Sequence, residues 1–295
     1  MIVDCHTHIW TSADQLGADG EAHLRRQVGT AEICADPSSH ALSGLCVDKT
    51  LVLSTPASDA DAKAANKFVA EYVAGHSNAM IGVAAVDPTE PDVIPQAEAL
   101  LDRNEFRGLV ISPAVQNFHP ADTRAMGLYD LAAKRAVPLF FHHGAHFPTK
   151  ARMEYARPSL LDEIACEYPD LNMVICSLGA PWINEGIALL GKHPHVFGDI
   201  SGLIRRPWEM YNTLVLTHQF NVMDKLLFGS GFPYLTAAKA IERVYRLHEI
   251  TQGTNLPSVP REALRSVVER DALKSLGLAR AGEVTSVQGG KDEEP

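Results

Sequence analysis

The sequence predicts an α/β fold of the (β/α)8 TIM-barrel type. Short apolar runs alternate with longer helix-like stretches, and this unit repeats eight times along the chain. The apolar runs are nearly continuous, which indicates parallel strands that are buried on both faces. An open doubly wound sheet is the less favoured alternative, because no G-x-G-x-x-G turn follows the first run.

The elements follow one another at regular spacing. Strands are expected at residues 1–8, 49–55, 80–86, 107–112, 138–143, 172–178, 196–201 and 225–230. Helices are expected at 58–75, 91–104, 122–136, 157–168, 182–192, 207–220, 237–250 and 261–276. We therefore expect one barrel over residues 1–278, followed by a polar, flexible tail over residues 279–295 that ends in KDEEP.

Residues 11–48 interrupt this rhythm directly after the first strand. They show no sustained hydrophobic period and contain several glycines, and we expect one short helix near residues 21–28. A connection of this length without structure is uncommon in a compact domain. It is either a functional loop or a region with further elements, and its polar residues are candidates to fold over the barrel mouth.

The composition excludes several classes of protein. The net charge of −10 argues against a nucleic-acid partner, because no basic stripe is available to neutralise phosphates. No apolar run approaches the roughly 18 residues that cross a bilayer, and no basic stretch leads into an apolar core at the N-terminus. The five cysteines include no C-x-x-C pair. Together these features predict a cytoplasmic protein with reduced thiols and no membrane partner.

Histidines lie where two of the predicted strands end. His6 and His8 are two residues apart, so they point to the same face of the first strand and can share one metal ion. The fifth strand ends in His142 and His143, which are also able to bind a metal. In a TIM barrel the C-terminal strand ends form the active site. The pattern therefore indicates a metal site at the barrel mouth.

Several motifs carry a resemblance to a known family. They are IVDCHTHIW at Ile2–Trp10, NKFVAEYVAGHSNAMIGVAAVDP at Asn66–Pro88, VPLFFHHG at Val137–Gly144, VICSLGAPW at Val174–Trp182, VFGDISG at Val196–Gly202, LLFGSGFPY at Leu226–Tyr234 and ERDALKSLGL at Glu269–Leu278. The chain resembles the amidohydrolase superfamily, and within it the amidohydrolase-2 group that includes aminocarboxymuconate-semialdehyde decarboxylase and related hydrolases, hydratases and lactonases. The resemblance implies a metal-dependent TIM-barrel enzyme that acts on a small molecule.

The family site transfers only in part. The resemblance implies His6, His8 and His142 as ligands of one divalent metal, with zinc first and manganese or iron as alternatives. Ser177 stands where the family usually has a histidine, and Gly231 stands where it has an aspartate. That aspartate is normally both a metal ligand and the general base for the attacking water.

Because the usual general base is absent, other residues are candidates for the catalytic groups. Asp199, at the end of the seventh strand, and His143 are candidates for acid–base work, although a structural role for Asp199 is the simpler alternative. Arg205 and Arg206 are candidates to bind a substrate carboxylate, or else they form a solvated pair on a loop.

Two functions follow from this pattern. The first is a divergent metal-dependent hydrolase or decarboxylase that acts on a small molecule. The second is a degenerate, supporting subunit that assembles with a homologous metal-bearing chain, either a hydrolase or a di-metal oxidase or oxygenase. A metal-independent, lactonase-like hydrolase is a less favoured alternative. The resemblance implies that such enzymes depend on the aspartate whose position is occupied here by Gly231. A homo-oligomer or a hetero-oligomer with a homologous chain is expected in either case.

Overall fold

Eight parallel strands form the core of the computed structural model, which describes residues 1–29, 33–56, 62–143 and 147–279. The strands are β1 (Val3–Thr7), β2 (Lys49–Leu53), β3 (Met80–Ala85), β4 (Phe106–Ile111), β5 (Leu139–Phe141), β6 (Met173–Ile175), β7 (Val196–Asp199) and β8 (Leu226–Leu227). They pair in sequence order, and backbone contacts from β8 and the residues after it to β1 close the circle, with Cys5 N 2.9 Å from Phe228 O. The expected TIM barrel is confirmed.

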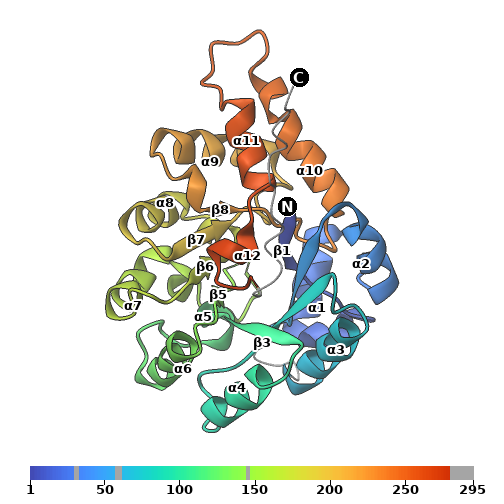
Figure 1. The fold of residues 1–295 in the computed structure, drawn as a ribbon, viewed down its shortest axis with the longest axis vertical. Coiled ribbons are helices and arrows are strands. Elements are labelled where there is room, and N and C mark those ends of the chain that lie inside the picture. The colour runs from blue at the N-terminus through green and yellow to red at the C-terminus, as the bar shows by residue number, and fades with distance from the viewer. Residues whose placement is uncertain (30–32, 57–61, 144–146, 280–295) are drawn as a thin grey trace, which may run out of the picture.

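Helices surround the strands (Figure 1). They are α1 (Gly17–Val28), α2 (Pro37–Ser43), α3 (Ala62–Ala74), α4 (Val93–Leu101), α5 (Pro113–Gln116), α6 (Thr123–Lys134), α7 (Asp162–Glu167), α8 (Ile183–Lys192), α9 (Pro207–Gln219), α10 (Ala237–Tyr245), α11 (Arg261–Val268) and α12 (Ala272–Ser275). Among the described residues, no helix combines the length and the apolar character needed to span a bilayer.

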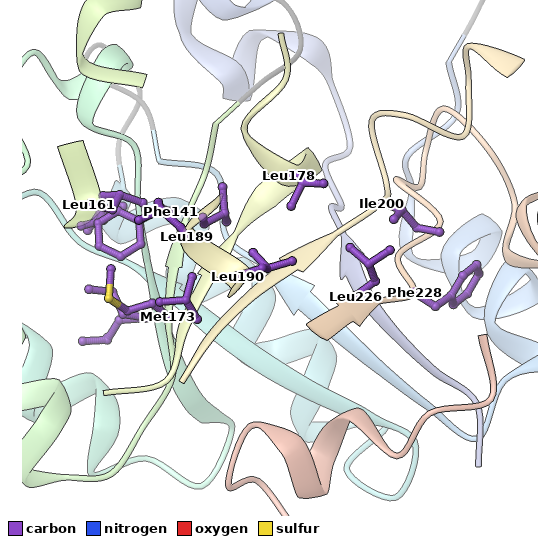
Figure 2. Close-up of a cluster of buried hydrophobic side chains, with 14 of the residues drawn as sticks. Phe141, Leu161, Met173, Leu178, Leu189, Leu190, Ile200, Leu226 and Phe228 are labelled. Atoms are coloured by element: carbon purple, nitrogen blue, oxygen red, sulfur yellow. The ribbon is translucent and has the colours of Figure 1, made fainter. Parts of the chain in front are cut away.

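The two faces of the strands belong to two apolar layers. Alternate residues such as Leu51, Leu53 and Phe140 fill the barrel interior, and residues of α12 join this inner cluster. The other face, which includes Phe141 and Met173, packs against the surrounding helices (Figure 2). Because both faces of each strand are buried, the strands read as continuous apolar runs in the sequence.

The excursion at residues 11–48 contains more structure than we expected. It holds a 3-10 helix at Ala13–Leu16, then α1, α2 and a further 3-10 helix at Gly44–Cys46. At the start of α2 the Asp36 side chain accepts hydrogen bonds from the backbone N–H groups of Ser38 and Ser39, and Pro37 occupies the first turn. The expectation of a single short helix was therefore wrong. The two 3-10 helices and α2 are too short to show a hydrophobic period, although Asp36-Pro37 indicates the start of a helix.

Three expected helices are interrupted in the structure. The expected helix at 157–168 divides into a 3-10 helix at Pro158–Leu161 and α7, and the one at 237–250 continues beyond α10 as a 3-10 helix. The one at 261–276 breaks between α11 and α12, where the Asp271 side chain accepts a hydrogen bond from Lys274 N. Residues 58–61 of another expected helix, and 280–295 of the expected tail, lie outside the described residues.

Candidate metal centre

Three imidazole rings meet at the C-terminal end of the barrel, as the sequence predicts. The Nε2 atom of His8 lies 3.1 Å from that of His6 and 3.2 Å from that of His142. All three residues line one cavity. Two of these side chains come from the end of β1 and its extension, and the third follows β5, so the barrel brings together ligands that are far apart in the sequence.

The hydrogen-bond partners determine which ring nitrogens carry a proton. His8 Nδ1 lies 2.8 Å from the carbonyl oxygen of Leu53, which can only accept, so His8 Nδ1 must donate. His6 Nδ1 lies 2.8 Å from Asp199 Oδ2 and donates to that carboxylate in the same way. In both rings the Nδ1 proton is therefore used in a hydrogen bond, and the Nε2 atom is the nitrogen that faces the cavity and is left to bind a cation.

Nε2 atoms this close to one another can share a proton or can bind one metal ion together. Burial, together with the charges of His6 and His142, lowers the pKa of His8, so this ring stays neutral. Burial and the charge of His6 also lower the pKa of His142 to about 3. Nitrogen ligands about 2.0–2.1 Å from a tetrahedral zinc ion are about 3.3 Å apart. The two distances from His8 Nε2 are close to that spacing, and ligand atoms of all three residues lie within 4.8 Å of one another, so the donor set fits one divalent metal.

Both carboxylate oxygens of Asp199 accept hydrogen bonds from residues at the metal centre. Its Oδ2 atom accepts from His6, and its Oδ1 atom accepts from Ser177 N and from the backbone N–H and hydroxyl of Ser201. Burial alone would raise the pKa of Asp199, but the charge of His6 and these hydrogen bonds hold it at about 2. Such a carboxylate is a weak base. Its geometry favours orientation of a metal-binding histidine over the general-base role that we also considered.

Ser177 and Gly231, which stand where the resemblance implies a histidine and an aspartate, line the same cavity. The Ser177 hydroxyl is 3.4 Å from that of Ser201 and accepts a hydrogen bond from Gly202 N. Gly231 has a φ of +68°, and a Cβ atom there would lie 3.2 Å from Ser201 O. This side of the cavity therefore offers hydroxyl and backbone groups and no carboxylate or imidazole at either position.

The cavity has a volume of about 200 Å³ and is covered by the excursion. Leu16, Leu24 and Gln27 form one wall, and Trp10, Phe147 and Tyr234 supply aromatic surface. Sequence reasoning missed these aromatic residues, because nothing in their spacing ties them to the strand ends. His23, which we had counted among the polar residues of the excursion, does line the cavity.

Arg205 is held at the cavity wall by two neighbours. Its guanidinium lies 4.0 Å from the centre of the Tyr234 ring, and its Nη1 atom donates to Gln27 Oε1 at 3.0 Å. Arg206 also lines the cavity, but its Nε atom donates to Glu209. Of the two arginines, Arg205 is the one that aromatic and amide contacts hold in place.

His143 lines the same cavity as His142, but its ring packs differently. Its ring stacks on Phe141 with the ring centres 6.2 Å apart, and Phe141 belongs to the layer between strands and helices. Both ring nitrogens of His143 are buried, and neither has a hydrogen-bond partner among the described residues. Burial lowers the pKa of His143 to about 3. An acid–base role for this neutral ring stays a prediction.

Comparisons with solved structures find proteins of the same fold. An uncharacterized TIM-barrel protein from Bordetella bronchiseptica is 16% identical, with a TM-score of 0.69 over 94% of this chain and 98% of that one. A 5-carboxyvanillate decarboxylase from Novosphingobium aromaticivorans, complexed with manganese and 4-hydroxy-3-methoxy-5-nitrobenzoic acid, is 13% identical, with a TM-score of 0.69 over 94% and 96%. A probable 2-pyrone-4,6-dicarboxylic acid hydrolase from Acinetobacter baumannii is 15% identical, with a TM-score of 0.63 over 94% and 99%.

These structural similarities establish the fold. A search of curated proteins finds no match to this chain. A family model described as amidohydrolase matches residues 3–278, which includes every strand of the barrel and all three histidines of the metal centre. The chain therefore belongs to the amidohydrolase family.

Proposed function

We propose that this protein is a metal-dependent enzyme that decarboxylates a small, carboxylated aromatic molecule. The observation that carries the proposal is the convergence of the Nε2 atoms of His6, His8 and His142 in a cavity with aromatic walls and a positioned arginine. The similar structures support the class of reaction, since one of them is a decarboxylase of an aromatic acid with bound manganese.

The histidines are the proposed ligands of one divalent metal. Three neutral nitrogen ligands leave open positions and suit zinc, with manganese and iron as alternatives. When bound, such an ion supplies Lewis-acid stabilisation of negative charge that develops on a substrate oxygen. Asp199 orients His6 by accepting its Nδ1 proton, and the Leu53 carbonyl does the same for His8.

The remaining residues of the cavity bind and desolvate the substrate. Arg205 is placed to contact a carboxylate, and the rings of Trp10, Phe147 and Tyr234 form apolar surface suited to an aromatic ring. An apolar surrounding disfavours a substrate carboxylate and favours its loss as uncharged carbon dioxide.

Decarboxylation fits this site better than hydrolysis does. Hydrolysis needs a positioned base to take a proton from water, and such a base contributes about 10²–10⁴-fold to the rate. Gly231 offers no side chain, Ser177 offers only a hydroxyl, and Asp199 is held at a pKa of about 2. Decarboxylation breaks the bond between the ring and the carboxylate, releases carbon dioxide and leaves the electron pair on the ring carbon, which takes up a proton from water that enters the cavity. No water has to be deprotonated to attack the substrate, so the loss of a general base impairs this reaction less.

The test combines metal analysis with a substrate panel. We expect about one tightly bound metal per chain, and carbon dioxide release from hydroxylated aromatic carboxylates but no hydrolysis of lactones or esters. His142→Ala should abolish both metal binding and turnover. Arg205→Met should raise KM while the metal content stays unchanged, and Arg124→Met, which removes an exposed arginine paired with Asp122, is the matched control. Turnover of lactones or esters alone would contradict the proposal.

A supporting subunit is the second candidate function. The observation that favours it is the replacement of two family site residues by Ser177 and Gly231 on one side of the cavity. Under this alternative the chain alone shows no turnover, and it co-purifies with a homologous metal-bearing chain that restores activity. Turnover by the isolated, metal-loaded protein as a homo-oligomer or monomer would exclude it.

A further inference from the structure

His40 lies behind the metal centre, on the short helix α2 of the excursion. Its side chain is 1% exposed. Its Nε2 atom lies 2.9 Å from the hydroxyl of Thr7, and its Nδ1 atom lies 2.8 Å from the hydroxyl of Tyr72. Thr7 stands between the proposed metal ligands His6 and His8. A residue of the excursion is therefore one contact away from both ligands of β1.

The direction of these hydrogen bonds follows from their partners. The Thr7 hydroxyl donates to the carbonyl oxygen of Leu51 at 2.7 Å, so its only proton is used there. Thr7 must accept from His40 Nε2, which therefore carries the ring proton. In a neutral ring His40 Nδ1 is then an acceptor. The Tyr72 hydroxyl lies 2.8 Å from it and 3.1 Å from the carbonyl oxygen of Pro37, so its single proton is available to one of these two acceptors. Burial, with a smaller contribution from His76, lowers the pKa of His40 to about 4, which agrees with a neutral ring in this tautomer.

The His40 ring also contacts the segment that follows β8. It meets the Phe232 ring edge-on, with the ring centres 5.1 Å apart. The carbonyl oxygen of Phe232 accepts a hydrogen bond from His8 N at 3.0 Å. His40 thus packs against the two residues, Thr7 and Phe232, whose own contacts set the backbone on either side of His8.

The strand pairing alone does not fix this part of β1. The register between β1 and β2 is regular at Val3 and Asp4, but it shifts before Thr7 pairs with Val52. An irregular ladder leaves the ligand-bearing end of the strand with fewer regular backbone contacts. The side-chain bonds of Thr7 to Leu51 and His40 lie at this irregularity.

We propose that His40 is a positioning residue of the metal centre, which holds His6 and His8 in their metal-binding arrangement through Thr7 and Phe232. The inference rests on the proposed metal function. Metal ligands must be held within about 0.5 Å of their productive geometry, and partners outside the ligand set typically change metal affinity 10–100-fold. Loss of the Thr7 contact is expected to release the end of β1.

The test measures the metal centre directly, without a substrate. Metal-free protein is titrated with Co²⁺, its affinity is measured by competition with a chelator, and its visible absorption bands report the coordination geometry. His40→Leu should weaken Co²⁺ binding about tenfold and change the spectrum. His40→Gln keeps a donor and an acceptor and should restore most of the affinity.

Two further variants separate positioning from stability. Leu128→Ala removes packing at a buried leucine of α6 and serves as a destabilised control whose Co²⁺ affinity and spectrum should stay unchanged. Thr7→Val removes the hydroxyl that accepts from His40. It should reproduce the spectral change, and the double variant with His40→Leu should show little additional loss of affinity.

The possible outcomes distinguish the two proposals. Wild-type protein that binds no Co²⁺ would overturn the proposed metal function and, with it, the role of His40. Wild-type binding that both His40→Leu and Thr7→Val leave unchanged would overturn the role of His40 alone. Equal losses in His40→Leu and Leu128→Ala would show that only general stability matters, and would also overturn it.

Discussion

The two sides of the barrel mouth have different chemistry. On the side of β1 and β5, three imidazoles meet with their Nε2 atoms 3.1 and 3.2 Å apart, and Asp199 and Leu53 orient two of them. On the side of β6 and β8, the corresponding positions hold Ser177 and Gly231. One side can hold a cation, whereas the other offers hydroxyl and backbone groups at those positions.

This difference shows that metal binding and proton transfer are separate properties of the site. The nitrogen ligands need only a shared direction and neutral rings, and burial together with fixed hydrogen bonds supplies both. Proton transfer from water needs an additional group of suitable pKa at hydrogen-bond distance. A chain can therefore keep the first property without the second, which is why the proposed reaction avoids activated water.

The largest expected effect is the pH dependence of stability that His40 causes on the β1 side of the barrel mouth. The pKa of His40 falls from its ordinary 6.5 to about 4 on folding, so the unfolded chain binds this proton more tightly than the folded protein does. The free energy of unfolding is therefore unaffected by this group above pH 6.5 and decreases as the pH falls from 6.5 toward 4. A shift of this size contributes about 3 kcal/mol to the free energy of unfolding. Urea unfolding of metal-free protein between pH 7 and pH 4 measures it.

His40→Leu isolates this contribution from that of the other histidines. The variant should lose the part of the pH dependence that belongs to His40, so its stability should fall less steeply than that of the wild type below pH 6.5. Parallel curves for the two proteins would show that His40 keeps its ordinary pKa in the folded state.

The next prediction tests whether metal affinity depends on the Asp199 carboxylate that orients His6. Asp199→Asn replaces the acceptor of the His6 Nδ1 proton with an amide and should weaken metal binding about 10–100-fold. Chelator competition measures the affinity, and circular dichroism confirms that the barrel is retained. Asp102→Asn, at an exposed ion pair with Arg135, is the matched control and should bind metal normally. Unchanged affinity in Asp199→Asn would mean that His6 is oriented without it.

The smallest effect comes from rebuilding the opposite side. Ser177→His combined with Gly231→Asp restores both family residues, and we expect metal binding to tighten about tenfold through the added ligands. Both positions have positive φ values, of +52° and +68°, which Asp and His tolerate better than β-branched residues do.

Gly231→Ala is the control for that strain. It places a Cβ atom 3.2 Å from Ser201 O without adding a ligand, so it should lower stability by about 1 kcal/mol and leave metal affinity unchanged. If the rebuilt double variant binds metal no better than Gly231→Ala, the two sides of the mouth do not face one metal ion.

Much of the architecture follows from the sequence by itself. Continuous apolar runs at regular spacing predict a parallel barrel, because strands that are buried on both faces consist mostly of apolar residues. The H-x-H pair at the end of the first run places two imidazoles on one strand face, and the family motifs identify His142 as their partner. The replaced positions, Ser177 and Gly231, are also readable directly from the family pattern.

Tertiary structure alone decided how those groups are held. Asp199 accepts hydrogen bonds from His6 and Ser177, Arg205 packs on Tyr234, and His40 contacts Thr7. Each of these contacts joins residues that are distant in the sequence. No local period records such contacts, because they arise only when the barrel closes and the excursion folds over it. The sequence determines which ligands are present, and the closed barrel determines their tautomers, their charge and their spacing.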